Sequence, residues 1–104
     1  MYALNEREEK VIGRFVDNQS KYEDAEMWLK WKDGSQVVAK YRMYLEDVND
    51  CEPEDEKYEE FWSFVFEVTD VKGTPPVYIT HHNLFIVSYH NFPDEIVVDG
   101  KKIN

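Results

Sequence analysis

Different spacings of apolar and polar residues along the chain predict its elements. The first lies in residues 5–19, where three apolar positions fall at helical spacing: Val11, Ile12 and Phe15. Asn5 and Glu8 have the separation of a capping pair, in which each side chain bonds the other residue's backbone N–H. We therefore predict a helix over about 5–19. Gly13 weakens a helix, so residues 11–16 remain open to a strand interpretation.

The second spacing is the alternation in residues 26–44, where Asp33-Gly34 separates two runs rich in β-forming residues. A two-residue turn would pair Leu29 with Val38. We favour a three-residue loop with Gly34 in the left-handed conformation, because it separates apolar from basic side chains more cleanly. One face then holds Met27, Leu29, Trp31, Val37, Ala39 and Tyr41. The opposite face is basic and holds Trp28, Lys30, Lys32, Gln36, Val38, Lys40 and Arg42.

The remaining patterns predict further strands. Residues 61–68 have one uninterrupted apolar face, formed by Trp62, Phe64, Phe66 and Val68. Residues 83–92 are apolar on both faces, so we place them as a central strand. Residues 95–104 predict a short closing hairpin that pairs Ile96 with Ile103.

These elements predict one domain over residues 1–104, since 104 residues can form a single core. The fold class is α+β, with an N-terminal helix packed on an antiparallel meander sheet of about five or six strands. The helix must cover one face of the sheet, because a sheet with one apolar face does not stand alone in water.

The charge of the chain is concentrated in one segment. Residues 46–60 contain nine acidic residues and one lysine, for −8. The other residues contain thirteen acidic and eleven basic residues, for −2, so the net charge is −10. Binding to nucleic acid needs clustered Lys and Arg, and an anionic membrane surface would repel this chain. We therefore exclude both partners and expect a cationic one.

Several features favour a cytoplasmic protein. Cys51 is the only cysteine, so no intramolecular disulfide can form. Residues 1–10 lack a basic segment followed by an apolar run, which a secretory leader would have. No apolar stretch approaches the ~20 residues that a membrane-spanning helix needs.

Two interpretations of the acidic segment remain open. Oxygen ligands for Ca²⁺ are offered by Asp47, Asn49, Asp50 and Glu52. The fit to an EF-hand loop fails, because Glu52 stands where that loop needs glycine and Tyr58 where it needs a bidentate glutamate. Alternatively, Pro53 begins a short helix over 53–60, and the acids of its first turn are favoured by the helix dipole. The segment would then be a solvated surface.

No motif commits the chain to a reaction. His81 and His82 would point to opposite faces of a strand, and His82 would lie roughly 26 Å from His90 along a continuous strand, too far for one Zn²⁺. Seven acidic residues within five positions of Cys51 disfavour its thiolate. We predict no catalytic residue, no metal site and no cofactor. A small enzyme with a carboxylate-lined pocket remains the third alternative.

Two segments of the chain, EFWSFVFEV over 60–68 and HNFPDEIVVDGKKI over 90–103, resemble short uncharacterised bacterial proteins of about this length. The resemblance spans most of the chain, and it implies no activity, substrate or site.

The function that these observations favour is a non-catalytic binding module for a basic protein partner, as in an inhibitor or immunity protein. The predicted partner-binding residues are Glu46, Asp47, Asp50, Glu52, Glu54, Asp55, Glu56, Glu59 and Trp28. The main alternative is a self-associating structural protein. In that homodimer, the basic hairpin face with Trp28 would meet the acidic segment of a second copy.

Overall fold

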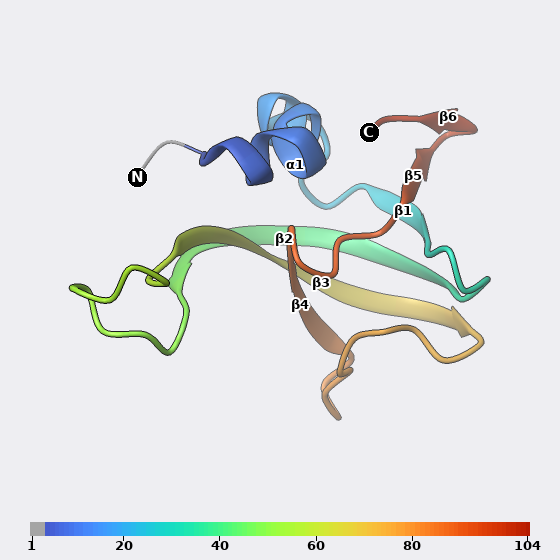
Figure 1. Ribbon diagram of the computed structural model, residues 1–104. Helices are drawn as coiled ribbons and strands as arrows, with labels where there is room; N and C mark the ends of the chain where they lie inside the picture. Colours follow the sequence, from blue (N-terminus) through green and yellow to red (C-terminus); the bar gives the residue numbers. More distant parts are fainter. Residues whose placement is uncertain (1–3) are drawn as a thin grey trace.

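The computed structural model describes residues 4–104, and there it shows a helix packed on a six-stranded antiparallel sheet (Figure 1). The elements are α1 (Glu6–Asn18), the 3₁₀ helix η1 (Gln19–Lys21), β1 (Glu26–Lys30), β2 (Gln36–Val48), β3 (Glu60–Lys72), β4 (Leu84–Ser88), β5 (Glu95–Val98) and β6 (Lys101–Lys102). The strand order is β4-β3-β2-β1-β5-β6. The predicted α+β class is confirmed. β1 to β4 follow one another as a meander, and β5 then joins the sheet beside β1.

The part of the leader prediction that falls on residues 1–3 lies outside the described residues. None of the helices within residues 4–104 is long and apolar enough to cross a membrane.

A complete capping box begins α1. The Asn5 side chain accepts a hydrogen bond from the Glu8 N–H at 2.8 Å, and Glu8 Oε1 accepts one from the Asn5 N–H at 3.1 Å. Residues 11–16 are helical, so the predicted helix is confirmed and the strand alternative is wrong. Ile12 and Phe15 are fully buried, which holds α1 against one face of the sheet.

The hairpin of β1 and β2 has the predicted three-residue loop. Leu29 pairs with Val37, and the Trp31 N–H donates to the Ser35 carbonyl at 3.1 Å. Gly34 has φ of +92°, in the left-handed region. All six residues of the predicted apolar face are buried. The hydrophobic pattern therefore determined the strand register, as expected for a sheet with one buried face.

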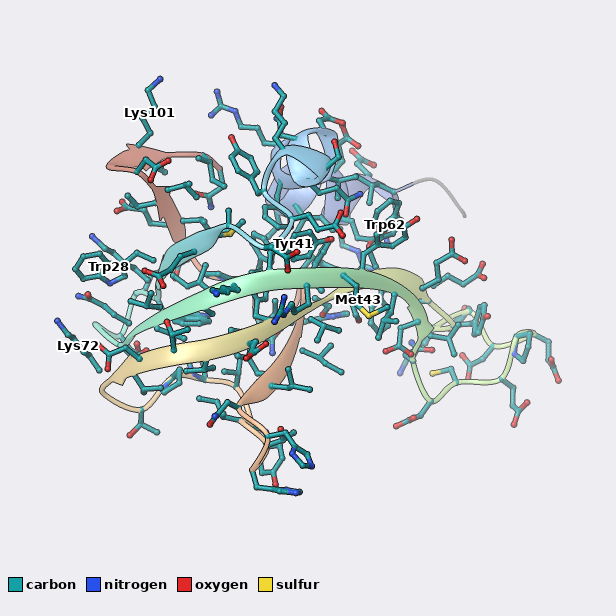
Figure 2. The ribbon with its side chains drawn as sticks, turned by 180° about the vertical axis from the view of Figure 1, so that it is seen from behind. Trp28, Tyr41, Met43, Trp62, Lys72 and Lys101 are labelled. Carbon is teal, nitrogen blue, oxygen red and sulfur yellow. The ribbon has the colours of Figure 1, made fainter. Side chains whose placement is uncertain are left out.

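A β-bulge in β2 divides this strand into two parts. Tyr41 pairs with Phe66 and Met43 pairs with Val65, so Arg42 is an extra residue with no opposite partner on β3. One extra residue turns the following side chains to the other face of the sheet. Tyr41 therefore faces α1, whereas Met43 lies on the far side of β2 (Figure 2).

The core lies between α1 and the sheet. The Phe15 ring contacts the rings of Tyr41, Phe64 and Phe92, with centroid separations of 5.1, 5.2 and 5.6 Å. The predicted burial of Trp62, Phe64 and Phe66 is confirmed. Because Phe92 belongs to the β4–β5 connection, that connection crosses the sheet on the α1 side and brings β5 beside β1.

The predicted central position of residues 83–92 is wrong, because β4 is an edge strand that pairs with β3. Phe85 and Val87 are buried against the core, whereas Ile86 points the other way and is 51% exposed. The C-terminal hairpin is confirmed, since the Ile103 N–H donates to the Ile96 carbonyl at 2.9 Å. The second apolar face of β4 is thus open to solvent.

Candidate functional site

The acidic segment 46–60 forms the end of the β2–β3 hairpin. Glu46 and Asp47 lie in β2, and residues 49–59, here named the acidic loop, lead from β2 to β3. The acidic loop extends beyond the sheet, at the end away from β5 and β6 (Figure 1). The helix predicted over 53–60 is wrong, because these residues form turns and the start of β3.

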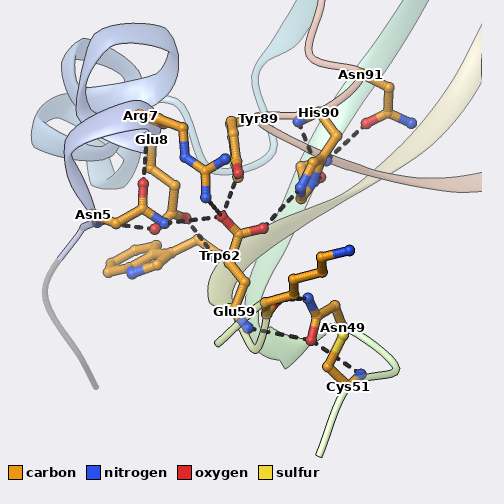
Figure 3. Close-up of polar contacts among 12 residues, drawn as sticks. Asn5, Arg7, Glu8, Asn49, Cys51, Glu59, Trp62, Tyr89, His90 and Asn91 are labelled. Atoms are coloured by element: carbon orange, nitrogen blue, oxygen red, sulfur yellow. Dashed lines mark hydrogen bonds and ion pairs between the residues drawn. The ribbon is translucent and has the colours of Figure 1, made fainter. Parts of the chain in front are cut away.

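Asn49 closes the acidic loop at its base. Its N–H donates to the Glu59 carbonyl at 3.0 Å, and its side-chain amide donates to the Lys57 carbonyl at 2.7 Å. Its side-chain oxygen accepts from the N–H groups of Cys51 and Glu59, both at 3.2 Å (Figure 3). The loop therefore has a hydrogen-bonded base and a charged tip. The exposed acidic side chains of that tip are Asp50, Glu52, Glu54, Asp55 and Glu56.

Glu59 differs from the other predicted binding residues, because its carboxylate points into the protein (Figure 3). Its side chain is only 11% exposed. Oε2 accepts a hydrogen bond from Arg7 Nη2 at 2.7 Å and another from the Tyr89 hydroxyl, while Oε1 lies 3.0 Å from His90 Nε2. Glu59 therefore joins α1, the end of the acidic loop and the β4–β5 connection.

The electrostatics of this cluster favour the charged form of Glu59. Burial raises the pKa of Glu59, but hydrogen bonds from Tyr89 and His90 outweigh it. The charge of Arg7 acts in the same direction, so the pKa of Glu59 lies below its ordinary value. Burial, followed by the hydrogen bond to Glu59, raises the pKa of Tyr89 to about 12. The Tyr89 phenol is therefore a neutral donor to a charged carboxylate.

Glu8 is a second inward-pointing carboxylate. It is fully buried, and its Oε2 accepts a hydrogen bond from the Trp62 N–H at 2.8 Å. Its other oxygen completes the capping box with Asn5. Glu8 thus links the first turn of α1 to the start of β3, and its role is structural.

Trp28 lies at the opposite end of the sheet from the acidic loop (Figure 2). Its indole N–H donates to Gln36 Oε1 at 2.7 Å. The ammonium groups of Lys30 and Lys72 lie 5.2 and 5.5 Å from its ring, as in cation–π contacts. The structure therefore does not bring Trp28 together with the predicted acidic binding residues.

Acidic residues outside segment 46–60 neutralise part of the predicted basic face. Arg42 pairs with Glu67 at 2.6 Å and also with Asp24, and Lys30 pairs with Glu95 at 3.5 Å. The face is therefore less cationic than its sequence indicates.

Among residues 4–104, no group of three or more His, Cys, Asp and Glu side chains could hold a metal ion. Asn49, one of the Ca²⁺ ligands considered, uses its side-chain oxygen within the acidic loop. His81 and His82 lie in a turn with ring centroids 3.9 Å apart, so the strand that would have turned them to opposite faces is not formed. His90 contacts Ser88 Oγ at 2.7 Å.

A hollow of about 330 Å³ lies where η1 meets the β2 bulge; its lining includes Gln19, Glu23, Tyr41 and Tyr44. The Tyr41 hydroxyl donates to Gln19 Oε1 at 2.6 Å. Burial raises the pKa of Tyr41, and the charge of Glu23 adds to the increase. The phenol at this hollow is thus a neutral donor that ties η1 to the sheet.

The sheet face opposite α1 carries an apolar patch that the sequence analysis missed. Met43, Val65 and Ile86 pair directly across β2, β3 and β4, and Leu45 and Tyr78 extend this row. We name these five residues the apolar patch. Met43 and Ile86 are each 51% exposed, and Tyr78 is 82% exposed. A hollow of about 460 Å³ adjoins the patch; it is lined by Val65, Tyr78, Thr80, Leu84, Phe85, Ile86 and Asn91.

An exposed charged loop beside an open apolar surface is typical of a protein-binding domain. Residues 11–104 match the family model described as cognate immunity protein YxxD, so the chain belongs to this family. Membership implies a non-catalytic binding function toward a protein, a cognate toxin. The match also names the family, whereas the resemblance seen in the sequence was only to uncharacterised bacterial proteins. The comparisons with curated proteins and with solved structures found no match.

The pattern Tyr-x-x-Asp occurs once in the chain, as Tyr44-Leu45-Glu46-Asp47. It follows the bulge in β2 and leads into the acidic loop. The Tyr44 ring stacks on Trp62 on the α1 side, with centroids 4.9 Å apart. Leu45 and Asp47 are on the opposite face, because the side chains of a strand alternate. The pattern therefore contributes to both faces of the hairpin.

Proposed function

We propose that this protein neutralises its cognate toxin by binding a basic surface of that toxin with the acidic loop. The observation that carries the proposal is the concentration of charge. Residues 46–60 hold −8 of a net −10, and their exposed acids project from a member of an immunity protein family. A compact negative projection fits a positively charged cleft or groove.

The mechanism that this arrangement supports is electrostatic steering followed by occlusion. A cationic toxin is attracted over about one Debye length, roughly 8 Å at physiological ionic strength. Steering raises the association rate and makes it sensitive to salt. The hydrogen bonds of Asn49 at the base of the loop limit its freedom, so less conformational entropy is lost on binding.

The predicted binding residues take different roles in this proposal. The direct contacts are assigned to Glu46, Asp47, Asp50, Glu52, Glu54, Asp55 and Glu56. Glu59 supports the loop from inside, since its carboxylate is engaged by Arg7 and His90. Trp28 lies at the other end of the sheet, so it would serve only as a separate contact.

The test is capture of partners from a lysate of the source organism with two charge variants of equal net charge. The loop variant carries Glu52→Gln, Glu54→Gln, Asp55→Asn and Glu56→Gln. The control variant carries Glu9→Gln, Asp17→Asn, Glu26→Gln and Asp99→Asn, which are exposed acids outside segment 46–60. The captured protein is identified by mass spectrometry, purified, and expressed in a test host with and without this protein.

We expect wild type and the control variant to retain a basic protein that 0.5 M salt releases, and the loop variant to lose it. We also expect that protein to arrest growth alone and this chain to restore growth. Loss of capture by both variants would show that only net charge matters, and full capture by both would show that the acidic loop is not the binding surface. A captured protein without toxicity would contradict the immunity function.

A further inference from the structure

The apolar patch lies on the sheet face that α1 leaves open. Met43, Val65 and Ile86 form one cross-strand row over β2, β3 and β4. Tyr78 is the most exposed of the large apolar side chains in residues 4–104, and it lines the adjoining hollow. Contiguous exposed apolar side chains are costly in a monomer and often mark an interaction surface.

The patch is continuous with the acidic segment. Leu45 and Asp47 lie on the same face of β2 as Met43, because side chains two positions apart share a face after the bulge. The face thus changes from apolar to acidic toward the acidic loop. An apolar centre with a charged rim is the usual anatomy of a protein interface.

Charge determines what can cover this patch. Two copies of this chain joined through it would place two segments of −8 beside one interface, within molecules of net charge −10 each. Like charges beside the same interface oppose association of the two copies. A partner with an apolar centre ringed by Lys and Arg would instead be attracted by the same acids.

One edge of the sheet, β4, does not favour strand addition. The Thr80 hydroxyl and N–H bond the backbone N–H and carbonyl of Leu84 at 3.2 and 2.9 Å. At the other end of β4, Asn91 bonds the backbone N–H and carbonyl of Ser88 at 2.9 and 3.2 Å. These bonds satisfy backbone groups on the edge side of β4, which protects an edge strand from pairing with another chain. Beside β4, the face of the sheet, rather than this edge, is therefore the surface that we consider for a partner.

We propose that the apolar patch is the water-excluding centre of the toxin-binding interface, with the acidic loop as its rim. This inference rests on the proposed function and adds a second surface to it. The hollow of about 460 Å³ between Tyr78 and Ile86 receives a large apolar side chain of the toxin. Binding energy then comes mainly from the patch, whereas the loop sets the association rate.

The experiment compares single substitutions with a matched control. Ile86→Thr removes apolar area from the patch and keeps a β-branched residue in the strand. Val71→Thr is the control, because Val71 is also an exposed strand residue, at 40%, and lies roughly 20 Å along β3 from Val65. Tyr78→Ser is a second patch variant outside the strands, and loss of this 82% exposed side chain should leave the fold intact.

Association and dissociation rates are measured by interferometry, with the purified toxin recovered in the capture experiment as the probe. We expect Ile86→Thr and Tyr78→Ser to increase the dissociation rate at least about tenfold and to change the association rate less than about twofold. The four-acid loop variant should instead lower the association rate and change the dissociation rate little. Val71→Thr should match wild type in both rates. Oxidative footprinting should show Met43 protected in the complex.

The possible failures are distinguishable. If wild type binds no toxin, the proposed function and this inference both fail. If the loop variant loses binding while both patch variants bind as wild type does, the acidic loop acts alone and the patch inference is wrong. A wild-type dimer in sedimentation that Ile86→Thr converts to monomer would show that a second copy covers the patch, which also overturns the inference.

Discussion

Glu59 has a chemical role that its acidic neighbours lack. Its carboxylate receives hydrogen bonds from Arg7 and Tyr89 and lies beside His90, so one residue holds three segments together. An acid in such a setting stabilises the fold, whereas an exposed acid at the loop tip is free to act on a partner. Glu56 and Glu59, three positions apart, thus have different roles. Glu59 stabilises the fold, whereas Glu56 is exposed to a partner.

We predict that Glu59→Gln lowers the free energy of unfolding by about 1–3 kcal/mol, because hydrogen bonds to a charged acceptor are weakened or lost. Glu56→Gln is the control, and its effect should stay within about 0.5 kcal/mol, since Glu56 is exposed at the loop tip. Urea unfolding at pH 7 measures both. Equal stability of the two variants would contradict the role assigned to Glu59.

The lowered pKa of Glu59 predicts how this difference depends on pH. A carboxyl group with a lower pKa in the folded state stabilises the fold above its ordinary pKa, and loses that effect as pH falls through the folded pKa. The stability gap between wild type and Glu59→Gln should therefore be present at pH 5 and shrink as the pH falls below about 4.5. A gap that grows below pH 4.5 would show that Glu59 is not stabilised as a carboxylate.

Local contacts at the residue scale could be predicted, and distant ones could not. Asn5 and Glu8 are three positions apart, so the capping pair is visible in the sequence and is confirmed. The contacts of Glu59 with Arg7 and His90 join residues 52 and 31 positions apart. No local spacing encodes such contacts, so Glu59 resembled its exposed neighbours.

At the scale of elements, the strand register was predicted where apolar and polar residues alternate regularly. Prediction failed where that alternation is interrupted. The β1–β2 hairpin was predicted because its apolar and basic faces are distinct over the whole run. The run after Arg42 no longer keeps apolar residues at alternate positions, and this was the available indication of the bulge that exposes Met43. Residues 53–60 lack an apolar stripe, so nothing packs a helix there against the protein.

Two glycines provide a test of these elements, because the same substitution should have opposite effects. Gly34 sits at φ +92° in the hairpin loop, where an alanine is strained, so Gly34→Ala should cost about 1–2 kcal/mol. Gly13 is helical, and the atoms nearest to a Cβ there belong to the flexible Glu9 side chain, at 3.4 Å. Gly13→Ala should therefore raise stability by up to about 1 kcal/mol. Chemical unfolding of both variants measures the signs, and equal signs would contradict the assigned conformations.

For the whole molecule, the uneven charge links function to stability. The ion pairs described for Arg7, Lys30 and Arg42 use acids that are engaged within the fold. The acids at the tip of the acidic loop repel one another in the free protein. A cationic partner would relieve that repulsion, so the surface that we propose for binding is also one that weakens the unbound protein.

Salt should therefore stabilise the free protein. Raising NaCl from 10 to 200 mM shortens the Debye length from roughly 30 Å to below 10 Å, so repulsion within the acidic loop is screened. We expect Tm to rise on the order of 3 °C. The four-acid loop variant, with net charge −6, should begin with a higher Tm and gain less from salt. The control variant has the same net charge but keeps the acidic loop, so it should retain most of the salt response. Calorimetric scans of the three proteins separate local from overall repulsion, and an identical response of the two variants would show that the acidic loop is no special source of repulsion.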